Sequence, residues 1–336
     1  MKNVLVTGGM GFIGSNFIRY ALAEHTDWTI TNLDKLTYAG NPENLRDIAR
    51  DNRYRFVKGD IADAALIDEI IGQHFDVIVN FAAESHVDRS IMDASPFVTT
   101  NIRGVQVLLE GVRKHGAGRF IQISTDEVYG SLSAEGKFRE DSPLMPNSPY
   151  AASKAAGDLL CRAYHHTYKL PVIVTHGSNN YGPYQFPEKL IPLVITNALE
   201  DKEIPVYGDG LNIRDWIHVC DHCRAIDLVI GSGRIGERYN IGAGSERTNL
   251  ALVKKILRIL HKSESLIRFV TDRPGHDQRY ALDTTRIAEK LGFRPRYSFD
   301  EAIEDTVNWY RDHEDWWQHI KSGAYLSYYE RMYTDR

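Results

Sequence analysis

Tyr150 and Lys154 are four positions apart in a segment with helical spacing, so both side chains lie on the same face of the predicted helix. An ammonium group near a phenol stabilises the phenolate and makes a tyrosine a usable base near neutral pH. The same spacing recurs at Tyr54 and Lys58, but these residues lie in a predicted strand, where positions four apart are not close neighbours. We therefore take Tyr150 and Lys154 as the candidate catalytic pair.

Hydroxyl and carboxyl groups follow the predicted strand 120–124. Thr125, Asp126 and Glu127 come directly after it. Because ligands bind at the carboxyl ends of strands in open α/β sheets, we expect these side chains to lie at a ligand-binding rim. The hydroxyl, the two acids and the Tyr-Lys pair would converge there.

A glycine-rich run, 8–14, follows the short apolar strand 3–7 and precedes a helix. Side chains in this turn would keep the backbone from a pyrophosphate, while the helix N-terminus offers free N–H groups. Asp34 follows the second strand, where its carboxylate can accept both adenosine ribose hydroxyls and would repel a 2′-phosphate. The pattern predicts a dinucleotide site that favours NAD, although the neighbouring Lys35 leaves NADP open. Asp60 lies where the adenine would be, with an ordinary turn acid as the alternative.

Strands and helices must alternate to position these residues. Short apolar or β-branched runs predict strands at 3–7, 28–33, 55–58, 77–81, 120–124 and 172–176. Helical spacing is found at 12–24, 62–71, 97–114 and 150–168. We predict an α/β fold, with a Rossmann-type doubly wound parallel sheet and a smaller mixed α/β substrate domain. The NAD-binding domain would comprise 1–178 with a returning segment near 213–243, and the nucleotide-sugar domain 179–212 and 244–336.

Composition excludes several classes of protein. The 336 residues are 43% hydrophobic and 25% charged, as in ordinary globular proteins. The net charge of −5, with basic residues scattered, argues against a nucleic-acid partner. Neither a membrane-length apolar run nor a leader-like start is found, so we expect a cytoplasmic protein without a membrane partner.

Three cysteines cannot form a paired framework. The run Cys220-Asp221-His222-Cys223 resembles half of a zinc or redox site, but a structural zinc site needs a second ligand pair. Cys161 lies far away in sequence. We expect no metal.

Three features together resemble the extended short-chain dehydrogenase/reductase family. They are the glycine turn Thr7-Gly8-Gly9-Met10-Gly11-Phe12-Ile13-Gly14, the stretch Ser124-Thr125-Asp126-Glu127-Val128-Tyr129-Gly130 and the Tyr150-Lys154 pair. The resemblance is closest to members that dehydrate dTDP-glucose, and it spans nearly the whole chain. Further matching stretches lie at 34–41, 82–90, 178–184, 273–277 and 321–325.

The resemblance implies conversion of dTDP-glucose to dTDP-4-keto-6-deoxyglucose. Tyr150, with Thr125 bonded to the same hydroxyl, would take the proton from the sugar 4-hydroxyl while hydride leaves carbon 4 for NAD. Lys154 would hold the nicotinamide ribose. Glu127 would remove the hydrogen on carbon 5 and Asp126 would protonate the departing 6-hydroxyl. Hydride would return to carbon 6, so NAD would stay tightly bound and be regenerated in each turnover.

The resemblance also implies two sets of contacts, and for the residues of the nucleotide-sugar set a surface salt bridge or turn hydrogen bond is the alternative. The implied cofactor contacts are Gly8, Gly11, Phe12, Ile13, Gly14, Asp34, Lys35, Leu36, Thr37, Asp60, Ile61, Phe81, Ala82, Ala83, Ser85, Thr100, Tyr150, Lys154 and Asn180. The implied nucleotide-sugar contacts, with two arginines neutralising the diphosphate, are Ser85, His86, Thr125, Asn179, Lys189, Leu190, Pro205, Tyr207, Arg214, Asn249, Arg273, His276 and Tyr333.

Departures from the family and competing functions leave alternatives open. His176-Gly177 and the shorter segment 130–147 differ from relatives; both are expected at the rim and bear on the nucleotide and sugar accepted.

A nucleotide-sugar 4-epimerase would need the Tyr-Lys pair but no acid pair; a dehydratase of another nucleotide sugar and a non-enzymatic NAD-binding scaffold are further alternatives. A homodimer through 97–114 and 150–168 is implied, although one chain could cover those apolar faces itself.

Overall fold

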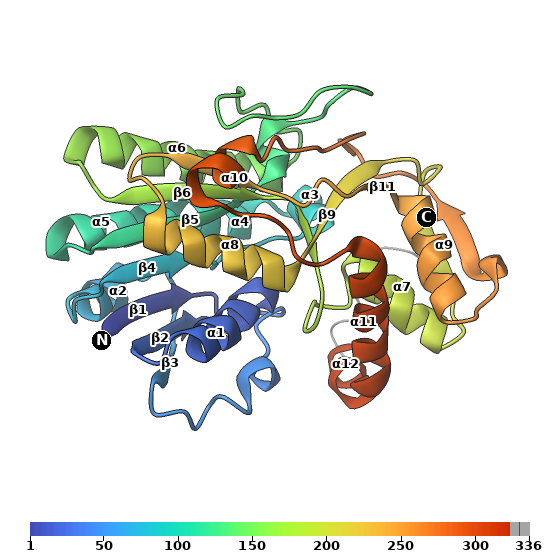
Figure 1. Ribbon diagram of the computed structural model, residues 1–336, viewed down its shortest axis with the longest axis horizontal. Helices are drawn as coiled ribbons and strands as arrows, with labels where there is room; N and C mark the ends of the chain where they lie inside the picture. Colours follow the sequence, from blue (N-terminus) through green and yellow to red (C-terminus); the bar gives the residue numbers. More distant parts are fainter. Residues whose placement is uncertain (323–328, 330–336) are drawn as a thin grey trace.

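The computed structural model describes residues 1–322 and residue 329 of the chain. Within them, a seven-stranded parallel sheet has the order β10-β6-β5-β4-β1-β2-β3, which confirms the predicted Rossmann-type architecture (Figure 1). Its strands are β1 (Lys2–Thr7), β2 (Trp28–Asp34), β3 (Tyr54–Lys58), β4 (Val77–Asn80), β5 (Arg119–Thr125), β6 (Val172–Gly177) and β10 (Arg238–Ile241). The strand order reverses between β1 and β4, and such a switch point opens a crevice at the carboxyl ends of the strands.

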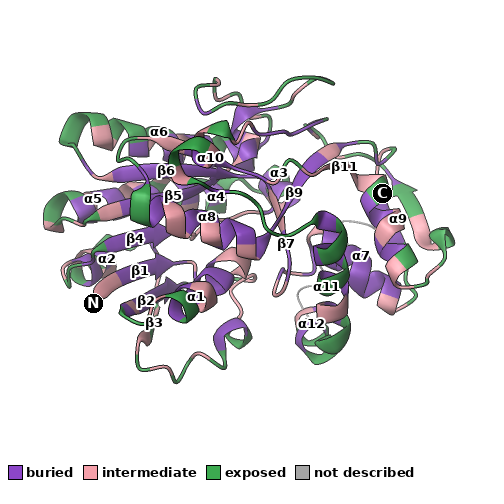
Figure 2. Ribbon diagram, viewed as in Figure 1, coloured by how far each residue is buried: buried purple, intermediate pink, exposed green. Residues whose placement is uncertain are grey.

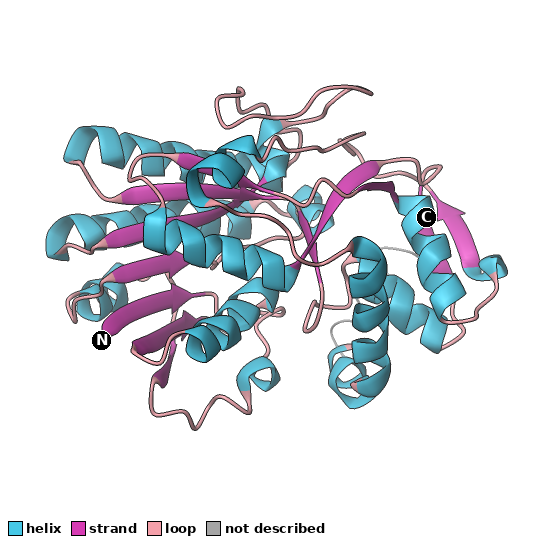
Figure 3. Cartoon of the chain, in the orientation of Figure 1, coloured by secondary structure: helices cyan, strands magenta, loops and turns pink. Residues whose placement is uncertain are grey.

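Helices cover both faces of this sheet (Figure 3). Helices α1 (Phe12–Glu24) and α8 (Val219–Ser232) pack together on one face, whereas α2 (Ala64–Ile71), α5 (Val105–His115) and α6 (Pro149–Tyr168) form the other layer. Both faces of the central strands are therefore buried (Figure 2), as expected for a parallel sheet, whereas the edge strand β3 is partly exposed.

A smaller part of the molecule has mixed sheets and its own core. Its three-stranded sheet contains β7 (Asn179–Tyr181), β9 (Ile213–His218) and β11 (Glu246–Thr248), and its two-stranded sheet contains β8 (Ile204–Tyr207) and β12 (Ile267–Val270). Around them lie α7 (Leu190–Leu199), α9 (Asn249–Ile259), η4 (Glu264–Leu266), α11 (Phe299–Asp312) and α12 (Glu314–Ile320). This matches the predicted mixed α/β part.

The division into domains at the predicted bounds stays a prediction. Helix α10 (Thr285–Leu291), placed by sequence in the second domain, packs against α8 and β10 of the large sheet. Ile287 accordingly belongs to the same apolar cluster as α1 and α8. The chain therefore returns to the large sheet a second time.

The structure is helical over the predicted range 97–114, but the first part is π-helical instead of α-helical. A short α4 (Ser95–Phe97) leads into a π-helical segment, η2 (Val98–Gly104), before α5 begins. Within η2, Asn101 bonds to the Glu84 backbone, with its Nδ2 2.9 Å from the carbonyl, and to Ser153 Oγ at 2.8 Å. The wider turn is thus associated with tertiary contacts that no local spacing reveals.

Three short elements complete the part that the structure describes: η1 (Pro42–Leu45), α3 (Val87–Met92) and η3 (Asp126–Tyr129). No helix among the described residues has both the length and the apolar character needed to span a membrane.

Candidate active site

A cavity of about 300 Å³ lies at the carboxyl end of the large sheet. Its walls come from the loops that follow β1 to β6 and from the start of α6. All the predicted cofactor contacts except Leu36 line it. The predicted catalytic residues Thr125, Asp126, Glu127, Tyr150 and Lys154 line the same cavity.

The glycine turn leaves the backbone bare at one end of this cavity. Gly8 has φ 71°, and a Cβ there would lie 2.5 Å from Ala82 N. A Cβ on Gly14 would collide with the Gly8 carbonyl oxygen. Helix α1 then begins without a side-chain cap, so its first N–H groups are offered to a ligand.

Asp34 and Asp60 mark the adenosine end expected from the sequence. Asp34 accepts hydrogen bonds from Met10 N at 2.9 Å and Leu36 N at 2.8 Å, and burial raises the pKa of its carboxyl group. It therefore also ties the glycine turn to β2. Lys35 forms an ion pair with Asp60 at 2.6 Å, so its charge is matched within the protein.

The short helix η3 presents the two acids directly after β5. Thr125 Oγ1 accepts from Glu127 N at 3.3 Å, lies within hydrogen-bonding distance of Asp126 Oδ1 at 3.2 Å, and is hydrogen-bonded to Tyr150. Ser148 caps α6 by accepting from Ala151 N at 3.1 Å, which places Tyr150 in the first helical turn. A threonine thus joins the acids to the tyrosine.

Different neighbours surround the two acids. Burial and then the charge of Glu127 raise the pKa of Asp126 well above its usual value, and Asp126 Oδ2 has no hydrogen-bond partner within the described chain. Burial also raises the pKa of Glu127, but three nearby cations oppose this: Arg273, Arg214 and Lys189. Asp126 is the better proton donor, and Glu127 is better placed to be ionised.

The Tyr150-Lys154 pair differs in part from the expectation. Burial, followed by the Glu127 charge, raises the pKa of Tyr150, while the Thr125 hydrogen bond lowers it. Lys154 Nζ donates to the Ile123 carbonyl oxygen at 2.7 Å, and burial lowers the pKa of its ammonium group. In this arrangement the lysine is held against β5, and Thr125 is the group that favours the phenolate.

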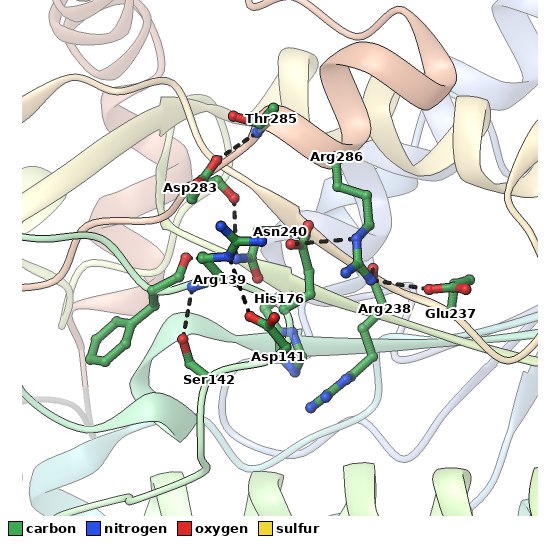
Figure 4. A network of polar contacts seen from close by, with 12 residues as sticks. Arg139, Asp141, Ser142, His176, Glu237, Arg238, Asn240, Asp283, Thr285 and Arg286 are labelled. Atoms are coloured by element: carbon green, nitrogen blue, oxygen red, sulfur yellow. Dashed lines mark hydrogen bonds and ion pairs between the residues drawn. The ribbon is translucent and has the colours of Figure 1, made fainter.

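His176 does not lie at the rim, contrary to the sequence expectation. Its ring is fully buried in β6, with Nε2 3.1 Å from Asp158 Oδ2 and Nδ1 2.9 Å from the Tyr129 hydroxyl. Tyr129 donates to Asn240 at 2.9 Å, and Figure 4 shows His176 and Asn240 in one polar network. Gly177, by contrast, lines the cavity.

The three cations predicted to bind the nucleotide sugar lie near Glu127. Lys189 Nζ donates to the Ser85 carbonyl oxygen at 2.7 Å, and Arg214 lies over the Tyr280 ring at 4.2 Å. Arg273 lies 3.8 Å from Asp88, and its buried Nε finds no partner in the described residues. This concentration of positive charge fits an anion such as a diphosphate.

The other predicted nucleotide-sugar contacts are more widely spread. Ser85 and Asn179 line the main cavity, whereas His276 lines a second hollow and bonds to Asp272 at 2.7 Å. Tyr333 lies outside the described residues. The remaining positions are His86, buried beside α3; Leu190, the first residue of α7; Pro205 and Tyr207 in β8; and Asn249, the first residue of α9.

Sequence reasoning missed several cavity residues. His222 was considered only as a possible metal ligand, yet it lines the cavity. No group of three or more potential metal ligands is found among the described side chains, and the absence of a metal stays a prediction. The other missed positions, most of them loop residues without a distinguishing pattern, are Leu33, Ala39, Gly40, Gly59, Glu84, Ile123, Ser178, Gln185, Phe186 and Glu188.

Comparisons with known proteins agree with this geometry. The family model described as GDP-mannose 4,6 dehydratase matches residues 5–306. A dTDP-glucose 4,6-dehydratase of Streptomyces niveus is 55% identical over 323 residues, covering 95% of this chain and 96% of the relative. The crystal structure of DesIV, a dTDP-glucose 4,6-dehydratase from Streptomyces venezuelae with NAD bound, has 53% identity and TM-score 0.93, covering 95% of this chain and 100% of that one.

A more distant structure is that of a UDP-glucuronic acid 4-epimerase from Bacillus cereus, in complex with UDP-glucuronic acid and NAD. It has 28% identity and TM-score 0.87, and covers 92% of this chain and 99% of that one. The fold is therefore shared by a dehydratase and an epimerase.

Proposed function

This chain belongs to the family that the GDP-mannose 4,6 dehydratase model describes, and on that premise we propose that it dehydrates dTDP-glucose to dTDP-4-keto-6-deoxyglucose with tightly bound NAD. The observation that carries this proposal is the acid pair. Asp126 and Glu127 stand beside Tyr150, and their surroundings favour a protonated acid next to an ionised one. Elimination of water needs both at one place.

The cavity fits a dinucleotide. The uncapped start of α1 and the bare glycine turn suit the pyrophosphate, and Asp34 suits the adenosine ribose. Tyr150 and Lys154 would hold the nicotinamide half. When bound, NAD supplies a group that accepts hydride from carbon 4 and gives it back to carbon 6.

The protein's own groups move the protons. Tyr150, hydrogen-bonded to Thr125, removes the proton of the sugar 4-hydroxyl. The resulting 4-keto group acidifies the hydrogen on carbon 5, which Glu127 removes as a proton and returns to carbon 5 when hydride is added at carbon 6. Asp126 protonates the 6-hydroxyl as it departs, so the bond from carbon 6 to oxygen breaks with release of water. Lys189, Arg214 and Arg273 would bind the diphosphate.

Incubation of the purified protein with dTDP-glucose, without added NAD, tests the reaction. We expect loss of one water by mass spectrometry and a 4-keto-6-deoxy sugar by NMR. UDP-glucose and GDP-mannose in parallel incubations test dehydration of other nucleotide sugars. An unchanged dTDP-glucose, also after addition of NAD, would contradict the proposal.

A 4-epimerase is the second candidate, because the same fold carries that activity in the Bacillus cereus enzyme. The discriminating variant is Glu127→Gln. We expect it to keep reduction of the bound cofactor, seen as absorbance at ~340 nm, but to lose at least ~100-fold in water elimination. Dehydration at the wild-type rate in Glu127→Gln would remove Glu127 from the mechanism. Epimerised product without water loss in the wild type would favour the epimerase.

We further propose a cytoplasmic homodimer that binds no nucleic acid. Support for the dimer comes from apolar side chains exposed on the two predicted contact segments: Val98 on η2 is 52% exposed and Leu159 on α6 is 54% exposed. Apolar exposure of this kind marks protein contacts when it is contiguous. Sedimentation velocity at micromolar concentration should give a dimer and Leu159→Glu should weaken it, whereas a wild-type monomer would contradict the dimer.

A further inference from the structure

His222 projects from the first turns of α8 into the cavity wall. Its side chain is buried, with 1% of the residue exposed. Nδ1 lies 2.8 Å from Asn180 Oδ1, whereas Nε2 has no hydrogen-bond partner among the residues that the structure describes. A buried polar atom without a partner at a cavity wall indicates a missing ligand group or a water molecule.

The hydrogen bonds fix which ring nitrogen carries the proton. Asn180 Nδ2 donates to the Ser178 carbonyl oxygen at 2.9 Å, so Asn180 Oδ1 is free to accept from His222 Nδ1–H. Burial lowers the pKa of His222 to about 4, which keeps the ring neutral near pH 7. Nε2 is therefore a pure acceptor, and its missing partner is a donor.

His222 lies at the end of the cavity where the sugar reacts. It borders Gly177, whose position in β6 pairs with Thr125 in β5. The ribose of the reacting half would be held by Tyr150 and Lys154 on α6, in the helix layer opposite α8. The carboxamide on carbon 3 of the nicotinamide ring would then be the N–H donor within reach of α8 at this end.

Gly177 leaves room for the histidine ring. A Cβ at this position would lie 2.9 Å from His222 Cε1 and 3.1 Å from Nε2. The ring is anchored by Asn180 and so cannot move aside without breaking that hydrogen bond. The unusual Gly177 is thus explained by the space that His222 occupies.

We propose that His222 Nε2 accepts a hydrogen bond from the carboxamide N–H of bound NAD and so sets the orientation of the nicotinamide ring. This inference rests on the proposed NAD-dependent function. It makes His222 a cofactor-binding residue with a directional preference. A cofactor without that N–H loses the contact.

The test compares NAD with 3-acetylpyridine adenine dinucleotide, in which a methyl group replaces the carboxamide NH₂. The cofactor is removed from the full-length protein, and both dissociation constants are measured by calorimetry. One hydrogen bond to a buried acceptor predicts that the wild type prefers NAD by about tenfold. His222→Phe should bind both dinucleotides with similar affinity, and His222→Gln, which keeps an acceptor, should retain much of the preference.

A matched control is His218→Phe, since His218 is also buried near the start of α8 but does not line the cavity. It should keep the wild-type preference. If His222→Phe does not fold, Gly177→Ala, which crowds the ring, should lower the preference instead. The same tenfold preference in the wild type and in His222→Phe, or in Gly177→Ala where His222→Phe does not fold, would overturn the inference, as would equal binding in the wild type. A wild type that binds neither dinucleotide would contradict the proposed function itself.

Discussion

At the scale of residues, the surroundings of Asp126 and Glu127 assign different roles to two neighbouring acids. Both are buried, but three cations face Glu127, whereas Asp126 is further disfavoured as an anion by Glu127 itself. The adjacent positions alone do not distinguish acid from base. The distinction comes from residues far away in the chain, such as Lys189 and Arg273.

Substitution of Asp126 by Asn tests its role as the acid. The variant should still oxidise carbon 4, because Tyr150 and Thr125 are unchanged. Elimination should slow by ~10²–10⁴-fold, the usual contribution of a general acid. Rapid-mixing absorbance at ~340 nm, where reduced nicotinamide absorbs, should show the reduced cofactor accumulating. Wild-type elimination in Asp126→Asn would show that another group donates this proton.

The pH dependence tests the cations around Glu127. Since Glu127 must be ionised, the rate should fall as the pH drops through its raised pKa. Removing a positive charge destabilises the carboxylate and raises this pKa further, so Arg273→Met should move the acidic limb of kcat to higher pH. Measurement at saturating substrate separates this effect from weaker binding. A limb that stays in place or moves to lower pH would exclude the electrostatic role of Arg273.

At the scale of elements, β5, β6 and α6 are joined below the site by a buried polar network. Asp158 on α6 accepts from Ser124 on β5 at 2.7 Å and contacts His176 on β6 at 3.1 Å. Asp158 follows Lys154 by about one helical turn. The network therefore fixes the helix that carries the Tyr-Lys pair relative to the strand that carries the acids.

Loss of His176 should cost stability because it leaves Asp158 and Tyr129 with fewer partners. We expect His176→Leu to lower the free energy of unfolding by about 1–3 kcal/mol. Urea denaturation followed by circular dichroism measures this difference. The control, His166→Leu at an exposed position on α6, should change stability by less than about 0.5 kcal/mol. Equal stability of both variants would show that the buried contacts carry no net free energy.

Some elements could be predicted from nearby residues in the sequence, and others could not. The helix 12–24 and the turn before it are defined by nearby residues, so their prediction from spacing and glycines was possible. The π-helical segment η2 accompanies contacts of Asn101 with Glu84 and Ser153, which lie on other elements. Apolar periodicity carries no signal of such contacts.

At the scale of the whole molecule, local sequence patterns predict only part of the site. The Tyr-Lys pair, the acids and the glycine turn have recognisable patterns, and the sheet brings them to one cavity. His222 reaches that cavity from α8, far away in sequence, and its four-residue motif, which resembles half of a zinc or redox site, gives no signal of a cavity position. The return of α10 to the large sheet was equally hidden, since its contacts depend on the path of the whole chain.

The most direct test of the central claim uses dTDP-glucose labelled with deuterium at carbon 4, in ordinary water and without added NAD. If retained cofactor carries the hydride from carbon 4 to carbon 6, the 4-keto-6-deoxy product should hold the deuterium at carbon 6, as seen by NMR. Deuterium lost to the solvent, or kept at carbon 4 without loss of water, would contradict an internal redox dehydration.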